Sequence, residues 1–271
     1  MTRYFASRVL FPLAATCLLG LAGCAGSPSD NISLAGPQAA APAAAAGTDG
    51  GLATEAVKWK RGKPGCKGQC PTLEVDSVRF PGDEKLSALV DHALVALTGL
   101  DPDQPRPYAT VSEYEQYFWQ TAGPRDETVL KASVKRQSGD LVVLQIDSYQ
   151  YTGGAHGIPA TQYLNCLRSR EQVLSLEDVL LPGRRDGYVQ ALRRAHQRWL
   201  ASNPDAQQDP ATYDRLWPFQ ESDNFALGDD GVIVKYSAYS IAPYSHGEPE
   251  LVIPYGDLRD VLKPDYLPRP S

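Results

Sequence analysis

The chain of 271 residues has few of the side chains that bind metals or nucleotides. It contains four histidines and five cysteines, and these do not fall into the paired spacings of a structural zinc site. Neither a G-x-G-x-x-G sequence nor a Walker loop is present, which argues against nucleotide chemistry. We therefore expect no metal and no cofactor.

Basic residues are outnumbered as well. Lysine and arginine total 26 against 32 aspartates and glutamates, which gives a formal charge of -6. Binding of nucleic acid through phosphate neutralisation is therefore not expected. An acidic protein instead attracts basic partners. With 42% hydrophobic and 21% charged residues, the composition is ordinary for one or two globular domains.

The chain begins with a segment typical of an export signal. Arg3 and Arg8 precede an apolar run that is too short for a permanent membrane span. The run ends in Leu-Ala-Gly-Cys, which resembles the bacterial lipobox, whose cysteine is acylated after cleavage. We predict a signal peptide over residues 1–23, lipidation of Cys24 and membrane contact through that anchor only; an ordinary secretory signal is the alternative. Alanine rather than aspartate at position 25 favours the outer membrane, facing the periplasm.

The residues after the lipobox are predicted to form a tether. Removal of residues 1–23 takes away two arginines and no acidic residue, so the mature balance is 24 − 32 = −8. Residues 24–56 consist largely of small residues and proline, and they have too little bulky apolar surface to fold. Such a chain reaches on the order of 30 Å, so the folded body can stand off the membrane.

Three cysteines remain after processing, because Cys17 is cleaved away and Cys24 is acylated. A local disulfide between Cys66 and Cys70 is our preferred pairing in an oxidising compartment. Bonds from either of them to Cys166 are the alternatives. Three residues separate Cys66 from Cys70, whereas a thioredoxin-like redox site has two.

The first half of the folded body reads as a mixture of strands and helices. Alternating apolar residues predict a strand over residues 73–80 and a hairpin over 130–146 with one buried and one solvent-facing side. Helical spacing predicts helices over 86–97 and 112–120, the second with Ser112 as its N-cap.

The second half continues in the same manner. It contains a predicted capping box at residues 175–178, a helix over 187–200 and a hairpin around Asp230-Gly231. Further elements are expected at 160–168, 250–254 and 255–262. The fold class predicted from these elements is α+β, with a mostly antiparallel sheet of hairpins packed against a few amphipathic helices. We expect an N-terminal part at 57–158 and a C-terminal part at 159–271.

Several motifs in the second half occur in a recognisable order. They are Tyr-Thr-Gly-Gly-Ala-His-Gly at 151–157, Leu-Ser-Leu-Glu-Asp at 174–178, Asn-Phe at 224–225, Ile-Ala-Pro-Tyr at 241–244 and Ile-Pro-Tyr at 253–255. In this order the chain, over about residues 70–260, resembles the RsiV-type extracytoplasmic domain. That family is named for a lysozyme-sensing anti-sigma factor and includes a module found on a peptidoglycan deacetylase.

The resemblance implies that the chain captures a wall-degrading enzyme. In the receptor of the family, the ectodomain binds lysozyme and blocks its cleft. Many lysozymes are strongly basic, so a partner with a charge of -8 would be steered towards them. The cytoplasmic sigma-binding segment of the receptor has no counterpart here, so signalling by that route is not expected.

Two loops, at residues 153–157 and 241–247, are the predicted partner-binding sites. The glycine-rich loop allows close approach of backbone, and its imidazole would donate to a carboxylate of the partner. The second loop offers a tyrosine that could stack or hydrogen-bond. The alternative for each loop is a structural connection. The candidate residues are Tyr151, Gly153, Gly154, His156, Pro243, Tyr244, Ser245 and His246.

We predict that the protein is a lipid-anchored, monomeric envelope protein. Its predicted partner is a lysozyme-like muramidase, which it binds and inhibits. Binding of peptidoglycan or muropeptides through the same loops is the alternative. A weak envelope hydrolase is a third interpretation, in which a metal is bound by His156, His246, Glu248 and Glu250 or Ser245 beside His246 acts as a nucleophile. Neither arrangement has the spacing of a known catalytic motif, so no catalytic residue is assigned.

Overall fold

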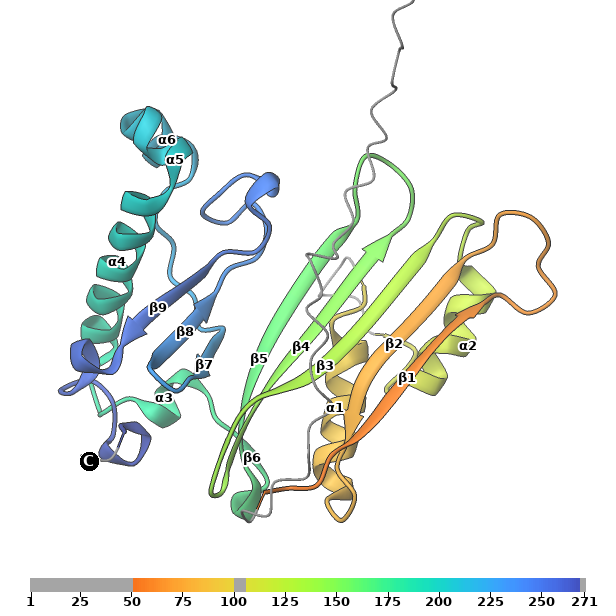
Figure 1. Cartoon of the computed structure of the whole chain (residues 1–271), viewed down its shortest axis with the longest axis horizontal. Coiled ribbons are helices and arrows are strands. Elements are labelled where there is room, and N and C mark those ends of the chain that lie inside the picture. The colour runs from red at the N-terminus through yellow and green to blue at the C-terminus, as the bar shows by residue number, and fades with distance from the viewer. Residues whose placement is uncertain (1–50, 100–105, 269–271) are drawn as a thin grey trace, which may run out of the picture. The chain divides into compact units, whose positions relative to one another are not determined.

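The computed structural model describes residues 51–99 and 106–268, which belong to one compact unit (Figure 1). The predicted signal peptide, the lipidation site Cys24 and the predicted tether up to residue 50 lie outside the described residues. Strand β1 begins at Glu55 and so includes the last two residues of the predicted tether. Within the described ranges, no helix has the length and apolarity needed to cross a membrane.

Two sheets form the framework, which confirms the predicted α+β class. The six strands of the larger sheet follow one another in chain order: β1 (Glu55–Gly62), β2 (Thr72–Arg79), β3 (Glu127–Ser138), β4 (Leu141–Tyr151), β5 (Ile158–Leu167) and β6 (Gln172–Val173). The smaller sheet contains β7 (Phe225–Leu227), β8 (Gly231–Lys235) and β9 (Glu250–Pro254). Only the β2–β3 pair is parallel among these strands.

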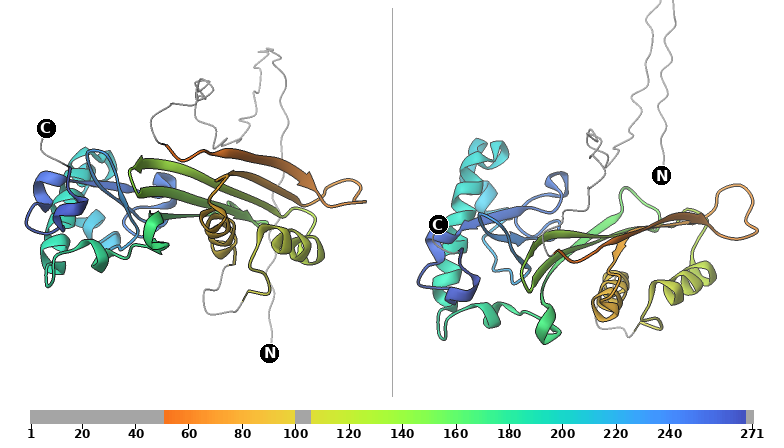
Figure 2. Two further views of the ribbon diagram at one scale, coloured as in Figure 1. Left: turned by 90° about the horizontal axis from the view of Figure 1, so that it is seen from below. Right: turned by 60° about the horizontal axis from the view of Figure 1, so that its bottom comes forward.

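Helices α1 (Glu84–Ala96) and α2 (Val111–Thr121) connect the parallel pair and cover one face of the six-stranded sheet (Figure 2). Their apolar residues and alternate residues of β2–β5 form the first core, in which Leu73, Leu94 and Leu130 are fully buried. The helices of the second half are α3 (Leu176–Val179), α4 (Arg185–Ser202), α5 (Pro204–Gln208) and α6 (Pro210–Leu216).

A second core joins α4, the three-stranded sheet and the far side of the larger sheet. It includes Val143 and Tyr163 from β4 and β5. The prediction that one side of the 130–146 hairpin faces solvent is therefore wrong at Val143, which is fully buried. The reason is tertiary, because the second core packs against that side of the strand. Tyr163 and Cys166 of β5 face different cores.

The smaller hairpin turns differently from the prediction. Gly228 donates its N–H to the carbonyl of Gly231, so Asp229-Asp230 is the loop and Gly231 is the first residue of β8. Gly231 has no positive φ; a Cβ there would lie 2.4 Å from the carbonyl oxygen of Ile253. This glycine thus permits close strand packing. The helix predicted over 255–262 is a shorter 3-10 turn, Tyr255–Leu258.

The N-cap of α2 is Thr110 rather than the predicted Ser112. The Thr110 hydroxyl accepts from the N–H of Glu113, and the Glu113 carboxylate accepts from the N–H of Thr110. Thr110→Ala is expected to lower the free energy of unfolding by about 1 kcal/mol, measured by urea denaturation. Ser112→Ala is the control, because Ser112 is exposed and its change should stay within about 0.5 kcal/mol. Equal losses in both variants would contradict this assignment.

Asparagine side chains join the two sheets where backbone pairing stops. The carboxamide of Asn165 on β5 donates to the carbonyl of Phe225 at 2.8 Å and accepts from the N–H of Leu227 at 2.8 Å. In return, Asn224 accepts from the N–H of Tyr163 at 2.8 Å. Each carboxamide bonds to backbone groups that a neighbouring strand would otherwise pair with. Together the two side chains hold β5 against β7.

The preferred disulfide prediction, a bond between two neighbouring cysteines, is correct. Cys66 and Cys70 form a disulfide within the β1–β2 connection. Cys166 is a free thiol that is 3% exposed in the first core. Burial raises the pKa of this thiol to about 12, so it has little thiolate character at neutral pH.

Candidate functional site

The two loops that the sequence singled out separately lie against each other. Residues 152–157 connect β4 to β5, and residues 236–249 connect β8 to β9. The ring of Tyr244 stacks on that of His156, with centroids 3.8 Å apart and planes inclined by 20°. The Tyr244 hydroxyl also donates to the carbonyl of Gly157 at 2.9 Å. Parts of the chain almost ninety residues apart therefore form one surface.

The His156 ring is held by the protein itself. Its Nδ1 lies 2.9 Å from the carbonyl oxygen of Gly157, which can only accept, so Nδ1 carries the proton. Its Nε2 lies 3.2 Å from the hydroxyl of Tyr239. In the neutral ring Nε2 accepts from this hydroxyl, which leaves no free N–H for the donation to a partner carboxylate that we expected. The structure thus gives His156 a positioning role within the loops.

Tyr239 is the outward-facing residue of the cluster, and the sequence analysis did not select it. Its φ is +69°, a conformation that costs a non-glycine residue about 1–3 kcal/mol. Its side chain is nevertheless 51% exposed. The ring lies 6.3 Å from that of Trp217, which follows α6, and 5.6 Å from that of Tyr244. We call His156, Trp217, Tyr239 and Tyr244 the aromatic site.

The glycine-rich loop is shaped from within. Gly153 and Gly154 have φ values of +96° and +106°, which favour glycine. The hydroxyl of Tyr151 donates to the carbonyl of Gly154 at 3.0 Å. At Gly157 the ring of Tyr149 occupies the space that a Cβ would need. Tyr151 and these glycines therefore support the aromatic site through the loop conformation.

The remaining candidates divide between two neighbourhoods. Pro243 immediately precedes Tyr244, a member of the aromatic site. His246 turns instead towards α4 and α5, where its Nε2 lies 3.4 Å from a carboxylate oxygen of Asp205. There it borders a cavity of about 220 Å³ beside Trp199. Ser245 is exposed and makes no hydrogen bond to His246 within the described residues.

The two histidines that the hydrolase alternative would bring together at a metal lie apart. His156 packs on Tyr244, whereas His246 meets Trp199 edge-on. Within residues 51–99 and 106–268, no group of three or more histidine, cysteine, aspartate or glutamate residues is arranged to hold a metal ion.

A carboxylate pair anchors the second loop to the larger sheet. The hydroxyl of Thr161 on β5 lies 2.7 Å from Asp147 Oδ1 and 2.8 Å from Glu248 Oε2. One hydroxyl proton cannot serve two carboxylates, so this geometry fits a protonated Glu248 that donates to Thr161, which donates to Asp147. Burial raises the pKa of Glu248, in agreement with this proton.

Glu248→Gln is expected to stabilise the protein at neutral pH, since the amide N–H₂ reproduces the donor of the protonated acid. A carboxyl whose folded pKa lies above its ordinary value of 4.5 stabilises the fold below that pH. The contribution is lost as the pH rises through the folded pKa. We expect a gain of up to about 1 kcal/mol at pH 7, absent near pH 4, in urea denaturation. Exposed Glu55→Gln is the control, and a gain that does not depend on pH would contradict the assignment.

Comparisons with known proteins place this geometry in context. The family model described as "Protein of unknown function (DUF3298)" matches residues 177–256, which include Trp217, Tyr239 and Tyr244. A crystal structure of a DUF3298 family protein from Pseudomonas aeruginosa PAO1 is 38% identical. It covers 83% of this chain and 100% of its own, with a TM-score of 0.75. A DUF3298 family member from Bacteroides fragilis NCTC 9343 shares the fold at 21% identity and a TM-score of 0.60, covering 78% of this chain and 94% of its own.

A curated relative carries a printed activity. The peptidoglycan-N-acetylmuramic acid deacetylase PdaC of Bacillus subtilis strain 168 is 26% identical over 146 residues, which make up 53% of this chain and 31% of that protein. This chain thus spans about a third of that relative. The expected kinship to a module on a peptidoglycan deacetylase is confirmed, whereas the kinship to the lysozyme sensor stays a prediction. The extent of the match to the Pseudomonas protein shows that the chain belongs to the DUF3298 family.

Proposed function

We propose that this protein is a monomeric cell-envelope protein that binds a lysozyme-like muramidase through the aromatic site. The observation that carries the proposal is the contact between the two loops. At this contact Tyr239 has a strained backbone and an exposed ring. Exposed tyrosine and tryptophan side chains on a rigid support are typical anchors of protein interfaces. A strained backbone that the surrounding structure maintains points to a functional role.

The remaining support comes from charge and kinship. The predicted mature chain has a formal charge of -8 (24 − 32), which would speed association with a basic enzyme at low salt. The PdaC relative is named for an activity on peptidoglycan, the polymer that muramidases cleave, which supports an envelope location. The lipid anchor at Cys24 and the outer-membrane location remain part of the proposal.

The test is inhibition of lysozyme on purified cell walls by the chain from residue 51 on. Near-equimolar inhibition of at least one lysozyme type, weaker at high salt, is the expected result. A fragment that neither inhibits nor forms a complex with lysozymes of several types would overturn the proposal.

Tyr239→Gly locates the interface. Glycine removes the ring and accepts the positive φ without strain, so the fold should be retained. We expect affinity for the muramidase to fall by about tenfold or more, measured by calorimetric titration. Tyr117→Ala is the matched control, because Tyr117 is also exposed but lies on α2. Unchanged affinity in Tyr239→Gly would exclude the aromatic site as the contact.

Direct binding of peptidoglycan is the second candidate, and the named activity of the PdaC relative favours it. Aromatic rings present a flat apolar face to a ligand while their polar edges meet water. Co-sedimentation with purified sacculi tests this function. If the native fragment pellets but Tyr239→Gly does not, and no lysozyme is inhibited, the ligand of the aromatic site is the wall polymer.

A further inference from the structure

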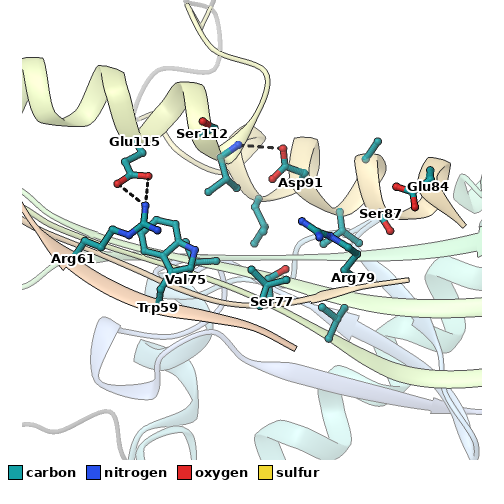
Figure 3. Close-up of a pocket in the computed structure, with 16 residues that line it drawn as sticks. Trp59, Arg61, Val75, Ser77, Arg79, Glu84, Ser87, Asp91, Ser112 and Glu115 are labelled. Carbon is teal, nitrogen blue, oxygen red and sulfur yellow. Dashed lines mark hydrogen bonds and ion pairs between the residues drawn. The ribbon is translucent and has the colours of Figure 1, made fainter. Parts of the chain in front are cut away.

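A groove lies under the first two strands, on the helix-covered face of the larger sheet. It has a volume of about 690 Å³ and runs between the inner face of β1–β2 and the helices α1 and α2 (Figure 3). Val57 and Trp59 of β1, Val75 and Ser77 of β2, and Val111 of α2 are among its lining residues. Ligand pockets in proteins have volumes of this order.

One of the two arginines in the groove is already neutralised. Arg61 donates to both carboxylate oxygens of Glu115, at 3.0 and 2.8 Å, and its guanidinium lies over the ring of Trp59 at 4.3 Å (Figure 3). This pair closes the end of the groove beside α2. The charges that remain for a ligand lie elsewhere.

Three polar groups in the groove are left without a complete set of partners among the described residues. The Ser77 side chain belongs to a residue only 6% exposed, yet its hydroxyl makes no hydrogen bond there. Two positions along β2, the guanidinium of Arg79 makes neither a hydrogen bond nor an ion pair. Asp91 on α1 uses one oxygen, Oδ2, to accept from the N–H of Val111 at 3.2 Å, and its Oδ1 has no partner. Figure 3 shows all three turned into the groove.

The charge pattern selects the class of ligand. Arg79, which is exposed and has no direct ion pair among the described residues, supplies positive charge, and Asp91 and Glu84 supply negative charge from one side of α1. A simple anion would be repelled by the carboxylates and a simple cation by the guanidinium. A molecule with both charges satisfies both sides. Such a ligand would pair with the guanidinium, the Ser77 hydroxyl and the free oxygen of Asp91 at the same time.

We propose that this groove binds a short peptide with free ends, its carboxylate on Arg79 and Ser77 and its ammonium facing Asp91 and Glu84. A guanidinium with an adjacent hydroxyl is a strong donor set for a carboxylate. The apolar floor of Val57, Trp59 and Val75 accepts aliphatic side chains. Stem peptides released from the cell wall and ordinary oligopeptides share this chemistry, and they differ in the chirality of some of their residues.

The experiment is a calorimetric titration of the full chain with trialanine of L residues and, separately, of D residues. Saturable binding with a dissociation constant below about 1 mM is expected for at least one of them. A preference for the D peptide assigns the ligand to the cell wall, and a preference for the L peptide assigns it to ordinary peptides. N-acetyl-trialanine amide, which carries no charge, should bind at least about tenfold more weakly.

Variants of the groove residues test whether the peptide binds there. Arg79→Gln and Asp91→Asn are each expected to weaken binding by about tenfold; the asparagine keeps the acceptor for Val111, so α2 stays in place. Asp76→Asn is the matched control, because Asp76 lies on the same strand but faces Lys58 on the opposite side of the sheet. Absence of saturable binding to both peptides, equal affinity for the uncharged peptide, or native affinity in both groove variants would overturn the proposal.

Discussion

Asn165→Ala is expected to lower the free energy of unfolding by about 2–5 kcal/mol. The side chain is 1% exposed and satisfies two backbone groups of β7, the carbonyl of Phe225 and the N–H of Leu227. Alanine leaves both groups buried without partners, and each unpaired group costs about 1–3 kcal/mol. Urea denaturation followed by circular dichroism measures the loss.

Asn224→Ala provides the comparison for this prediction. Asn224 performs the same bridging task from the other sheet, accepting from Tyr163 N–H and donating to the carbonyl of Thr161 at 2.7 Å. It is only partly buried, so water can replace its carboxamide and a loss of about 1 kcal/mol is expected. A smaller loss in Asn165→Ala than in Asn224→Ala would show that the bridge does not depend on burial.

Gly231→Ala is the second change with a large expected effect. The added Cβ would lie 2.4 Å from the carbonyl oxygen of Ile253 and 3.0 Å from its carbon. Both atoms belong to the backbone of β9, so no side-chain rotation removes the overlap and β8 must move away from β9. We expect the free energy of unfolding to fall by about 3 kcal/mol, again measured by urea denaturation.

Gly256→Ala separates this steric effect from the general effect of replacing glycine. Gly256 has no positive φ, and a Cβ there meets nothing within 4 Å. Its replacement should leave stability unchanged or raise it by about 0.5 kcal/mol through the unfolded chain. If Gly231→Ala also unfolds no more readily than the native protein, the strands of the small sheet are further apart than described.

Elements with strong local periodicity could be predicted from the sequence. The alternation in residues 130–146 and the helical spacing of residues 86–97 correspond to the β3–β4 hairpin and to α1, because one face of each is buried in the first core. Strand β1 was missed, since it is an edge strand whose residues are mostly exposed and whose apolar alternation is limited to Val57 and Trp59. The parallel pairing of β2 with β3 was missed as well, because it depends on how α1 and α2 pack.

Two short helices carried signals that could have been used. Asn203-Pro204 and Asp209-Pro210 each place a capping side chain before a proline, and α5 and α6 begin at these prolines. The aromatic site had no such signal. Trp217 meets Tyr239, and Tyr239 meets His156 of the other loop, only through tertiary packing. The positive φ of Tyr239 is also unusual for its residue type. Composition indicated that the two loops were special, but their contact required the fold.

Cys166 gives the protein a built-in reporter of its own unfolding. The thiol lies between the larger sheet and its helices, so a maleimide reagent can reach it only in molecules whose first core has opened. In the chain from residue 51 on, Cys66 and Cys70 are bonded to each other, so one labelled position per molecule would count the open fraction. Labelling rates at native conditions would therefore give the opening equilibrium directly, without denaturant and without an engineered probe.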